Sequence, residues 1–354
     1  MLIVPLMPLL LSLLLACTGS PSGEKLAEAP TADEPGAEVL LLPAELNTKW
    51  ANARCNDGTP FGLTLRRGTS DTWLIKVAGG HFCDDVVTIC SEREHRLTTG
   101  PTAPVIKGNG LVSTDWMANP TFYDANHVEL HYCSSDFWLG EHTEKIPNSA
   151  SAEGWYFSGR TNMKAAMELL TEEYGLTKDA KILLIGSSAG GIGVIANLDL
   201  WTGWSGLKAI LDGAWIKPQA DTGGTDPTRW GSPNRACAED RIAEGVDPVS
   251  CLLGPVWYPY FAQAGVPLLI QNSGLDLSQL KSKKIKRKPE LITWKRETLK
   301  SFADIEWLYS EGKRYHVLSF DRKFGVGPPG QSFREVVDRF WAGGEPERVL
   351  HNYN

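Results

Sequence analysis

The chain has 354 residues, of which 42% are hydrophobic and 22% are charged, and its formal net charge is −7. This length can bury a sizeable core, either as one large α/β domain or as two smaller domains. The negative charge argues against a nucleic-acid-binding protein, because such proteins carry a basic surface.

The N-terminal segment MLIVPLMPLLLSLLLA carries no charged side chain. It is too short to span a bilayer comfortably, but it suits the apolar core of a signal peptide. The next residue is Cys17, and Leu-Leu-Ala-Cys resembles the lipobox of bacterial lipoproteins, although no Lys or Arg stands near Met1. We therefore interpret residues 1–17 as a lipoprotein-type signal and expect an exported protein, lipid-anchored at Cys17 to a bacterial membrane or cell surface.

The sequence divides further by composition. Residues 18–45 are rich in Pro, Ala, Glu and Gly and show no apolar period until their end. This composition predicts a disordered tether. We expect the folded body over residues 46–345 and a short polar tail over residues 346–354.

The cysteines that follow Cys17 are even in number: Cys55, Cys83, Cys90, Cys133, Cys237 and Cys251. In an exported protein this predicts disulfide bonds, although the sequence leaves their pairing open. No C-x-x-C pair is present and the histidines are scattered. We therefore expect neither a metal site nor another cofactor.

Short apolar runs alternate with helix-like patterns along the body. The runs typical of buried strands cover 72–78, 127–132, 180–186, 207–213 and 266–274, and the amphipathic helix patterns cover 159–175, 190–204 and 332–344. This alternation predicts an α/β fold with a mostly parallel central sheet and helices on both faces. Functional sites in such sheets form beyond the carboxyl ends of the strands.

Gly186-Ser187-Ser188-Ala189-Gly190 stands between a predicted strand and a predicted helix. This G-x-S-x-G pattern is typical of a nucleophile elbow, in which Ser188 is held on a sharp turn with its hydroxyl exposed. The helix that follows would offer the amide of Ala189 and a favourable dipole to a developing oxyanion. The alternative is an ordinary strand-to-helix turn that contains serine.

A serine nucleophile needs a base and an acid, and α/β-hydrolases supply them in the order Ser, acid, His. His316 and His351 follow Ser188, and His351 lies in the polar tail, so His316 is the candidate base. Asp276 follows one apolar run and is the candidate acid, with Asp212 at the end of another run as its rival. The alternatives are an ordinary surface histidine and a loop-capping aspartate.

Gly79-Gly80-His81 follow the apolar run that precedes them directly. Glycines let the backbone approach a substrate closely. We expect the amides of Gly80, His81 and Ala189 to form an oxyanion hole. A plain turn is the alternative.

Several segments resemble the pectin acetylesterase/Notum family: CNDGTPFG (55–62), AGGHFC (78–83), NPTFYDANHVELHYCSSDFWLG (119–140), GSSAGGIGVIANLD (186–199) and LDLSQL (275–280). The resemblance covers about residues 50–345. It implies an α/β-hydrolase-type serine carboxylesterase. Plant members of this family remove acetyl groups from pectin, and the animal member Notum removes a fatty acyl group from a signalling protein.

The resemblance also implies residue roles. Ser188 would be the nucleophile, Asp276 the acid and His316 the base, and the implied disulfide bonds are Cys83–Cys90, Cys237–Cys251 and Cys55–Cys133. The chain departs from the family pattern at His81, where a Trp is usual, and at Tyr315, where plant members carry a cysteine. The first departure bears on acyl specificity.

Six of the eight residues in KSKKIKRK (281–288) are basic. We hypothesise that this segment attracts an acidic polysaccharide or an anionic membrane surface. An ordinary solvated loop is the alternative.

The leading functional hypothesis is an exported, monomeric serine carboxylesterase that removes O-acetyl groups from carbohydrate. One alternative is a Notum-like esterase for longer acyl chains on lipid or protein. The other is a non-catalytic module that binds carbohydrate or lipid on the same fold.

Overall fold

The computed structural model describes residues 37–41, 49–80, 82–83, 109–148, 150–218 and 229–353. These ranges include most of the body expected over residues 46–345. The expectations for Cys17, His81 and Cys90 lie outside them, as do the whole of the expected signal and most of the expected tether.

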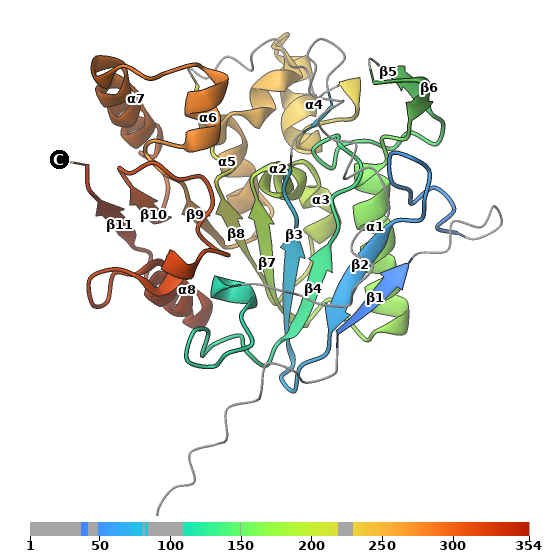
Figure 1. Cartoon of the computed structure of the whole chain (residues 1–354), viewed down its shortest axis with the longest axis horizontal. Helices are drawn as coiled ribbons and strands as arrows, with labels where there is room; N and C mark the ends of the chain where they lie inside the picture. Colours follow the sequence, from blue (N-terminus) through green and yellow to red (C-terminus); the bar gives the residue numbers. More distant parts are fainter. Residues whose placement is uncertain are drawn as a thin grey trace, which may run out of the picture.

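Nine of the described strands form one sheet (Figure 1). Their order across the sheet is β1 (Ala37–Leu41), β2 (Gly62–Arg66), β4 (Asn126–Leu130), β3 (Thr72–Val77), β7 (Lys181–Ser187), β8 (Leu207–Asp212), β9 (Leu268–Gln271), β10 (Trp307–Glu311) and β11 (Arg348–His351). Neighbours from β4 to β11 pair in parallel, whereas β2 pairs antiparallel with both β1 and β4. The prediction of an α/β fold with a mostly parallel sheet is confirmed.

Helices cover both faces of this sheet. The described helices are α1 (Gly159–Glu173), α2 (Ala189–Ala196), α3 (Leu198–Trp201), α4 (Arg235–Ala243), α5 (Gly254–Gln263), α6 (Leu277–Ser282), α7 (Lys288–Ser301) and α8 (Phe333–Ala342), with short 3₁₀ helices η2 (Gly110–Val112), η4 (Pro248–Leu252) and η5 (Arg322–Gly325). A separate hairpin joins β5 (Ile146–Asn148) to β6 (Ser151–Trp155).

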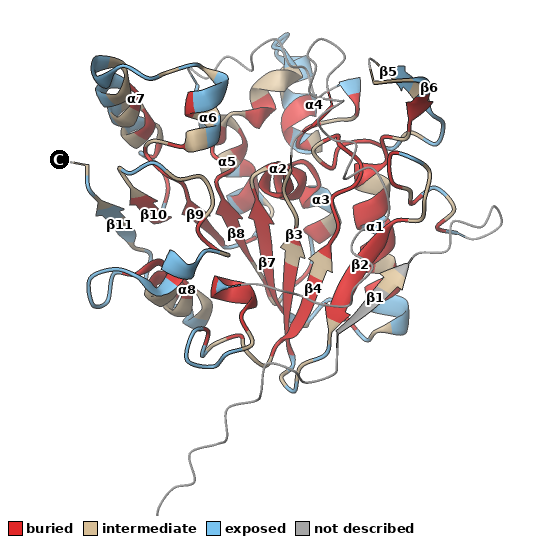
Figure 2. Cartoon of the chain, in the orientation of Figure 1, coloured by how far each residue is buried: buried red, intermediate tan, exposed pale blue. Residues whose placement is uncertain are grey.

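The residues of β7 alternate between two apolar cores. Ile182 and Leu184 belong to the larger core, which includes residues of α1, α2 and α5, and Leu183 and Ile185 belong to the core under α8. Because successive side chains of a strand point to opposite faces, a strand between two helical layers must be apolar throughout. Figure 2 shows the resulting buried strands at the centre of the molecule.

The folded body extends beyond residues 46–345 at both ends. β1 lies within the segment expected to be tether and pairs with β2 along its whole length. β11 lies within the expected polar tail and pairs with β10, and its Val349 packs against the core under α8. In both cases the short segment forms a strand because it pairs with the edge of the sheet. Its own sequence does not predict that pairing.

Two disulfide bonds join described cysteines, Cys55 to Cys133 and Cys237 to Cys251. Cys83 is also disulfide-bonded, and its expected partner, Cys90, lies outside the described residues. These bonds indicate that the body forms in an oxidising compartment.

Within the described ranges, the structure contains no helix that is long and apolar enough to cross a membrane. No group of three or more His, Cys, Asp and Glu side chains in the same ranges is arranged to hold a metal ion.

Candidate active site

Ser188 lies between β7 and α2 with φ 53° and ψ −123°, a conformation that a non-glycine residue adopts only on a strained turn. Its flanking glycines are required sterically. A Cβ on Gly186 would lie 2.6 Å from the Cα of Gly191, and a Cβ on Gly190 would lie 2.0 Å from the carbonyl oxygen of Val77. The turn therefore brings β3, β7 and α2 together closely enough to lock Ser188 in place.

Three of the predicted site residues form one hydrogen-bonded chain. Ser188 Oγ lies 2.7 Å from His316 Nε2, and His316 Nδ1 lies 2.8 Å from Asp276 Oδ2. Ser188 follows β7, Asp276 follows β9, and His316 follows β10, so all three stand beyond the carboxyl ends of parallel strands. This arrangement can pass a proton from the serine hydroxyl to the imidazole ring.

Asp276 has a second bond that fixes its orientation. Its Oδ1 accepts a hydrogen bond from Gln279 N at 2.9 Å, which caps the N-terminus of α6. The side chain of Asp276 is 1% exposed and that of His316 is 27% exposed. The base therefore faces the solvent side of the site while the acid is held beneath it.

The pKa of His316 is raised above its ordinary value. Burial alone lowers this pKa, but the hydrogen bond to Asp276, the charge of Asp276 and the charge of Asp212 together outweigh burial. The ring is thus a strong enough base to take a proton as an oxyanion forms.

Asp212, the rival acid, does not bond to the His316 ring. It is fully buried at the end of β8, and its Oδ2 accepts hydrogen bonds from the amides of Leu318 and Ser319 at 2.8 and 2.5 Å. Burial raises the pKa of Asp212 to about 6 despite these bonds. The structure therefore brings Asp276, and not Asp212, to the imidazole.

The glycine-rich loop after β3 lies directly against the serine turn. A Cβ on Gly79 would lie 2.4 Å from the carbonyl oxygen of Ser187 and 3.1 Å from Ser188 Cβ. Ala189 is the first residue of α2, so its amide has no acceptor within that helix. Gly79 and Ala189 therefore flank the serine, and Gly80 follows Gly79 in the same loop; the oxyanion hole expected from Gly80 and Ala189 stays a prediction, and His81 lies outside the described residues.

A tight loop after β4 contains site residues that sequence reasoning missed. Trp138 Nε1 donates to the carbonyl oxygen of Ala78 at 3.0 Å, and the rings of Phe137 and Phe82 lie 4.4 Å apart. These contacts hold the glycine-rich loop at both of its ends. The Ser-Ser-Asp run before Phe137 was the available signal, because Ser and Asp side chains commonly bond to a nearby turn backbone.

Asp136 organises that loop from inside. Its carboxylate is fully buried and accepts hydrogen bonds from the Ser134 hydroxyl and from the amides of Trp138, Gly140 and Gly159. Ser135, Phe137 and Trp138 all have positive φ, which is a strained conformation for residues with a side chain. The bonds to Asp136 offset that strain.

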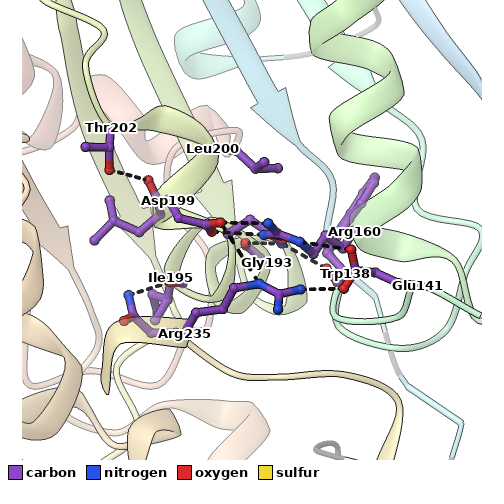
Figure 3. A network of polar contacts seen from close by, with 12 residues as sticks. Trp138, Glu141, Arg160, Gly193, Ile195, Asp199, Leu200, Thr202 and Arg235 are labelled. Carbon is purple, nitrogen blue, oxygen red and sulfur yellow. Dashed lines mark hydrogen bonds and ion pairs between the residues drawn. The ribbon is translucent and has the colours of Figure 1, made fainter. Parts of the chain in front are cut away.

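A polar network fixes the far end of the serine helix. Arg160 bonds to Asn197 and Asp199, Arg235 pairs with Glu141, and Figure 3 shows both arginines lying between Glu141 and Asp199. Asn197 also donates to the carbonyl oxygen of Trp138 at 2.8 Å. α1, α4 and the loop after β4 are thereby joined to the end of α2.

The basic segment 281–288 covers the end of α6, the turn that follows it and the first residue of α7, a few residues after Asp276 (Figure 1). Lys284 and Lys286 are exposed, and Arg287 forms an ion pair with Glu290. The attraction of an acidic polymer or membrane stays a prediction. Charge reversal that leaves the salt dependence of substrate binding unchanged would contradict it.

Comparison with known proteins decides the family. The family model described as pectinacetylesterase matches residues 41–223, which is more than half of the chain. The chain belongs to the pectinacetylesterase family. Members of this pectin acetylesterase/Notum family are carboxylesterases, and the match includes the loop after β3, the loop after β4 and the serine turn.

Curated relatives of this family member are named palmitoleoyl-protein carboxylesterase NOTUM. The Drosophila melanogaster protein is 36% identical over 152 residues, which cover 41% of this chain and 22% of the relative. The human protein is 34% identical over 166 residues, which cover 46% of this chain and 32% of the relative. The chain thus matches between about a fifth and a third of the length of these relatives.

The fold of this family member is similar to a solved structure described as the Wnt deacylase Notum from Drosophila. The TM-score is 0.74 at 23% sequence identity, and the alignment covers 90% of this chain and 96% of the other. This likeness shows a shared α/β-hydrolase fold.

Proposed function

We propose that the protein is a serine carboxylesterase with Ser188 as nucleophile, His316 as base and Asp276 as acid. The main support is the hydrogen-bonded chain from Ser188 through His316 to Asp276, in which Ser188 Oγ lies 2.7 Å from His316 Nε2 and His316 Nδ1 lies 2.8 Å from Asp276 Oδ2. It stands in a member of a carboxylesterase family, next to a glycine-rich loop. A non-catalytic binding module would not require these three side chains to meet.

In the proposed mechanism, His316 takes the proton of the Ser188 hydroxyl as its oxygen attacks the ester carbonyl carbon. The amides of Gly80 and Ala189 donate hydrogen bonds to the oxyanion that forms. The protonated His316 then gives its proton to the departing alcohol, which leaves an acyl group on Ser188. Water then attacks the acyl-enzyme with His316 again as base, and the carboxylic acid product leaves Ser188.

Substitution tests this assignment directly. Ser188→Ala should abolish hydrolysis of p-nitrophenyl acetate, and Asp276→Asn should lower kcat by about 10⁴-fold, because an amide holds the wrong tautomer of the imidazole. His351→Gln is the matched control, since that histidine lies on β11 away from Ser188, and it should keep wild-type activity. Turnover by Ser188→Ala equal to the wild type would contradict the proposal.

We propose acetylated carbohydrate as the substrate class. The support is the pectinacetylesterase description of the matching family model. A second candidate is a long-chain acyl group on protein or lipid, because the curated relatives are named palmitoleoyl-protein carboxylesterases.

Acyl-chain length separates the two candidates. The proposal predicts that kcat/KM falls from p-nitrophenyl acetate through butyrate and octanoate to palmitoleate. A rise with chain length would favour the second candidate. Binding of acetylated pectin without hydrolysis of any ester would favour the non-catalytic module.

We further propose that the protein is exported and anchored through a lipid on Cys17. The disulfide bonds of the body and the apolar N-terminal segment support export. Cys17→Ser should move the protein from the membrane fraction to the soluble exported fraction of a bacterial host. An unchanged membrane fraction would contradict the anchor.

A further inference from the structure

Asp212 is a buried carboxylate that the proposed mechanism does not use. It ends β8, which lies between β7, the strand before Ser188, and β9, the strand before Asp276. It is fully buried, although a buried carboxylate is costly unless its charge is compensated. The free-energy cost of burying a carboxylate at this position indicates that its contacts or its charge have a role.

The side chain of Asp212 holds the segment around His316 on both sides of the ring. Oδ2 accepts from the amides of Leu318 and Ser319, which follow His316. Gln271 lies between Oδ1 and the hydroxyl of Tyr315; in the amide orientation that satisfies both groups, its nitrogen donates to Oδ1 and its oxygen accepts from that hydroxyl at 2.8 Å. Tyr315 directly precedes His316, so one carboxylate fixes the backbone after the base and, through Gln271, the side chain of the residue before it.

The backbone of Asp212 reaches the nucleophile. Its carbonyl oxygen accepts a hydrogen bond from the Ser188 amide at 2.8 Å. The next residue, Gly213, lies against the ring, since a Cβ there would be 3.1 Å from His316 Nδ1. A single residue therefore connects the serine turn to the histidine segment.

Hydrogen bonding alone does not explain why residue 212 is an aspartate and not an uncharged residue such as asparagine. The partners of Asp212 among the described residues are neutral amides, and an asparagine could accept the two backbone bonds with one oxygen. A carboxylate adds a second acceptor oxygen, which meets Gln271, and a negative charge. Charge at this place acts on the imidazole, which becomes positive when it takes the proton from Ser188.

We propose that Asp212 is a positioning residue that holds Ser188 and His316 in register and stabilises the protonated imidazole with its charge. This inference rests on the proposed esterase function. It assigns to the end of β8 a role that complements the contact between Asp276 and His316.

The titratable groups around this position are His316 and Tyr315, with Asp276 beyond His316 and Glu311 beyond Tyr315. The pKa of Asp212 is about 6, so its charge is present above that pH and is lost as pH falls through it. Its charge raises the pKa of His316. Removing the charge must therefore lower the pKa of the base.

The pH profile of kcat/KM for p-nitrophenyl acetate, measured from pH 4 to 9, tests the proposal. Asp212→Asn should move the acidic limb to lower pH by about half a unit. Asp212→Ala, which also loses the bonds to Leu318 and Ser319, should lower kcat by about 10²-fold. Asp338→Asn removes a half-buried carboxylate elsewhere, on α8 and bonded to Thr121, and should leave the profile unchanged.

A second substitution covers misfolding of the Asp212 variants. Gln271→Met removes the donor to Asp212 Oδ1 and should raise the pKa of Asp212 further. The acidic limb of kcat/KM should then move to lower pH, as in Asp212→Asn, whereas general damage to the fold would lower activity equally at all pH values without moving the limb.

Three outcomes are decisive. An acidic limb of Asp212→Asn that coincides with that of the wild type overturns the electrostatic role. Asp212→Ala with wild-type kcat overturns the positioning role. A wild-type protein with no Ser188-dependent hydrolysis instead refutes the esterase proposal, so the two failures are distinguishable.

Discussion

Gly213 lies against His316, the proposed catalytic base, with φ +69°. A Cβ at this position would lie 2.5 Å from the carbonyl oxygen of His316 and 3.2 Å from its Cε1. Because Ser188 and His316 are only 2.7 Å apart, a small displacement of the ring breaks their hydrogen bond.

Gly213→Ala should therefore lower kcat/KM by about 10²-fold. Gly203→Ala is the matched control, because Gly203 has a similar φ of +84° and nothing within 4 Å of an added Cβ. The control carries the backbone strain without the steric contact. Equal kinetics for the two variants would show that the ring is not held as closely as the geometry indicates.

At the residue scale, the serine turn could be predicted because its chemistry is local. Gly186, Ser188 and Gly190 lie within five consecutive residues, and the steric need for Gly186 arises within the turn, although that for Gly190 arises from Val77 on β3. The choice between Asp276 and Asp212 was open, because both end apolar runs. Their roles depend on distant partners: Asp276 bonds to the imidazole of His316, 40 residues away, whereas Asp212 accepts from the amide of Ser319, 107 residues away.

At the scale of elements, the core strands and helices follow from apolar pattern, whereas interruptions come from distant contacts. The helix expected over residues 190–204 divides into α2 and α3 at Asn197. The side chain of Asn197 bonds to Gly193 O and to Trp138 O, and the second acceptor is 59 residues away. The local sequence pattern does not indicate that distant hydrogen-bond partner.

The loop after β4 yields a prediction at the same scale. Trp138→Phe keeps an aromatic ring beside Phe61 and Tyr132 but leaves Ala78 O without its indole donor. We expect a loss of about 1–3 kcal/mol in the free energy of unfolding. We also expect a lower kcat with little change in KM, because Ala78 begins the glycine-rich loop.

Trp201→Phe is the control for that variant. Trp201 is fully buried, and its Nε1 has no hydrogen-bond partner among the described residues. Its replacement therefore changes ring size without removing a hydrogen bond. Parallel measurement of urea unfolding and of kcat distinguishes the two, and indistinguishable kcat values would contradict the proposed support of the oxyanion loop.

For the molecule as a whole, two buried histidines on and after β4 set the response to acid. Burial lowers the pKa of His127 to about 4, with a further contribution from Arg66, and burial lowers the pKa of His131 to about 4. Both values lie below the pKa of an unfolded histidine. Their contribution to stability is therefore complete above about pH 6.5 and is lost as pH falls from there to about 4.

His127→Gln combined with His131→Gln should flatten the pH dependence of the free energy of unfolding. Relative to the variant, the wild type should lose on the order of 3 kcal/mol per histidine between pH 6.5 and pH 4. Urea unfolding at a series of pH values measures this difference. Parallel curves for the two proteins would show that neither histidine titrates as its burial implies.

The overall architecture was predictable because the alternation of strands and helices extends through the body, and central parallel strands such as β7 are apolar on both faces. The two ends of the folded body could not be predicted in this way. β1 and β11 are short edge strands whose assignment depends on pairing with β2 and β10, so composition assigned them to a tether and a tail.

The central claim is that Ser188 is the nucleophile, and covalent labelling tests it most directly. The wild-type protein would be treated with a fluorophosphonate and digested, and the modified residue would be located by mass spectrometry. We predict one adduct, on Ser188, formed slowly in His316→Ala and absent in Ser188→Ala. Labelling of another residue, or none in a wild-type protein that hydrolyses p-nitrophenyl acetate, would contradict the account.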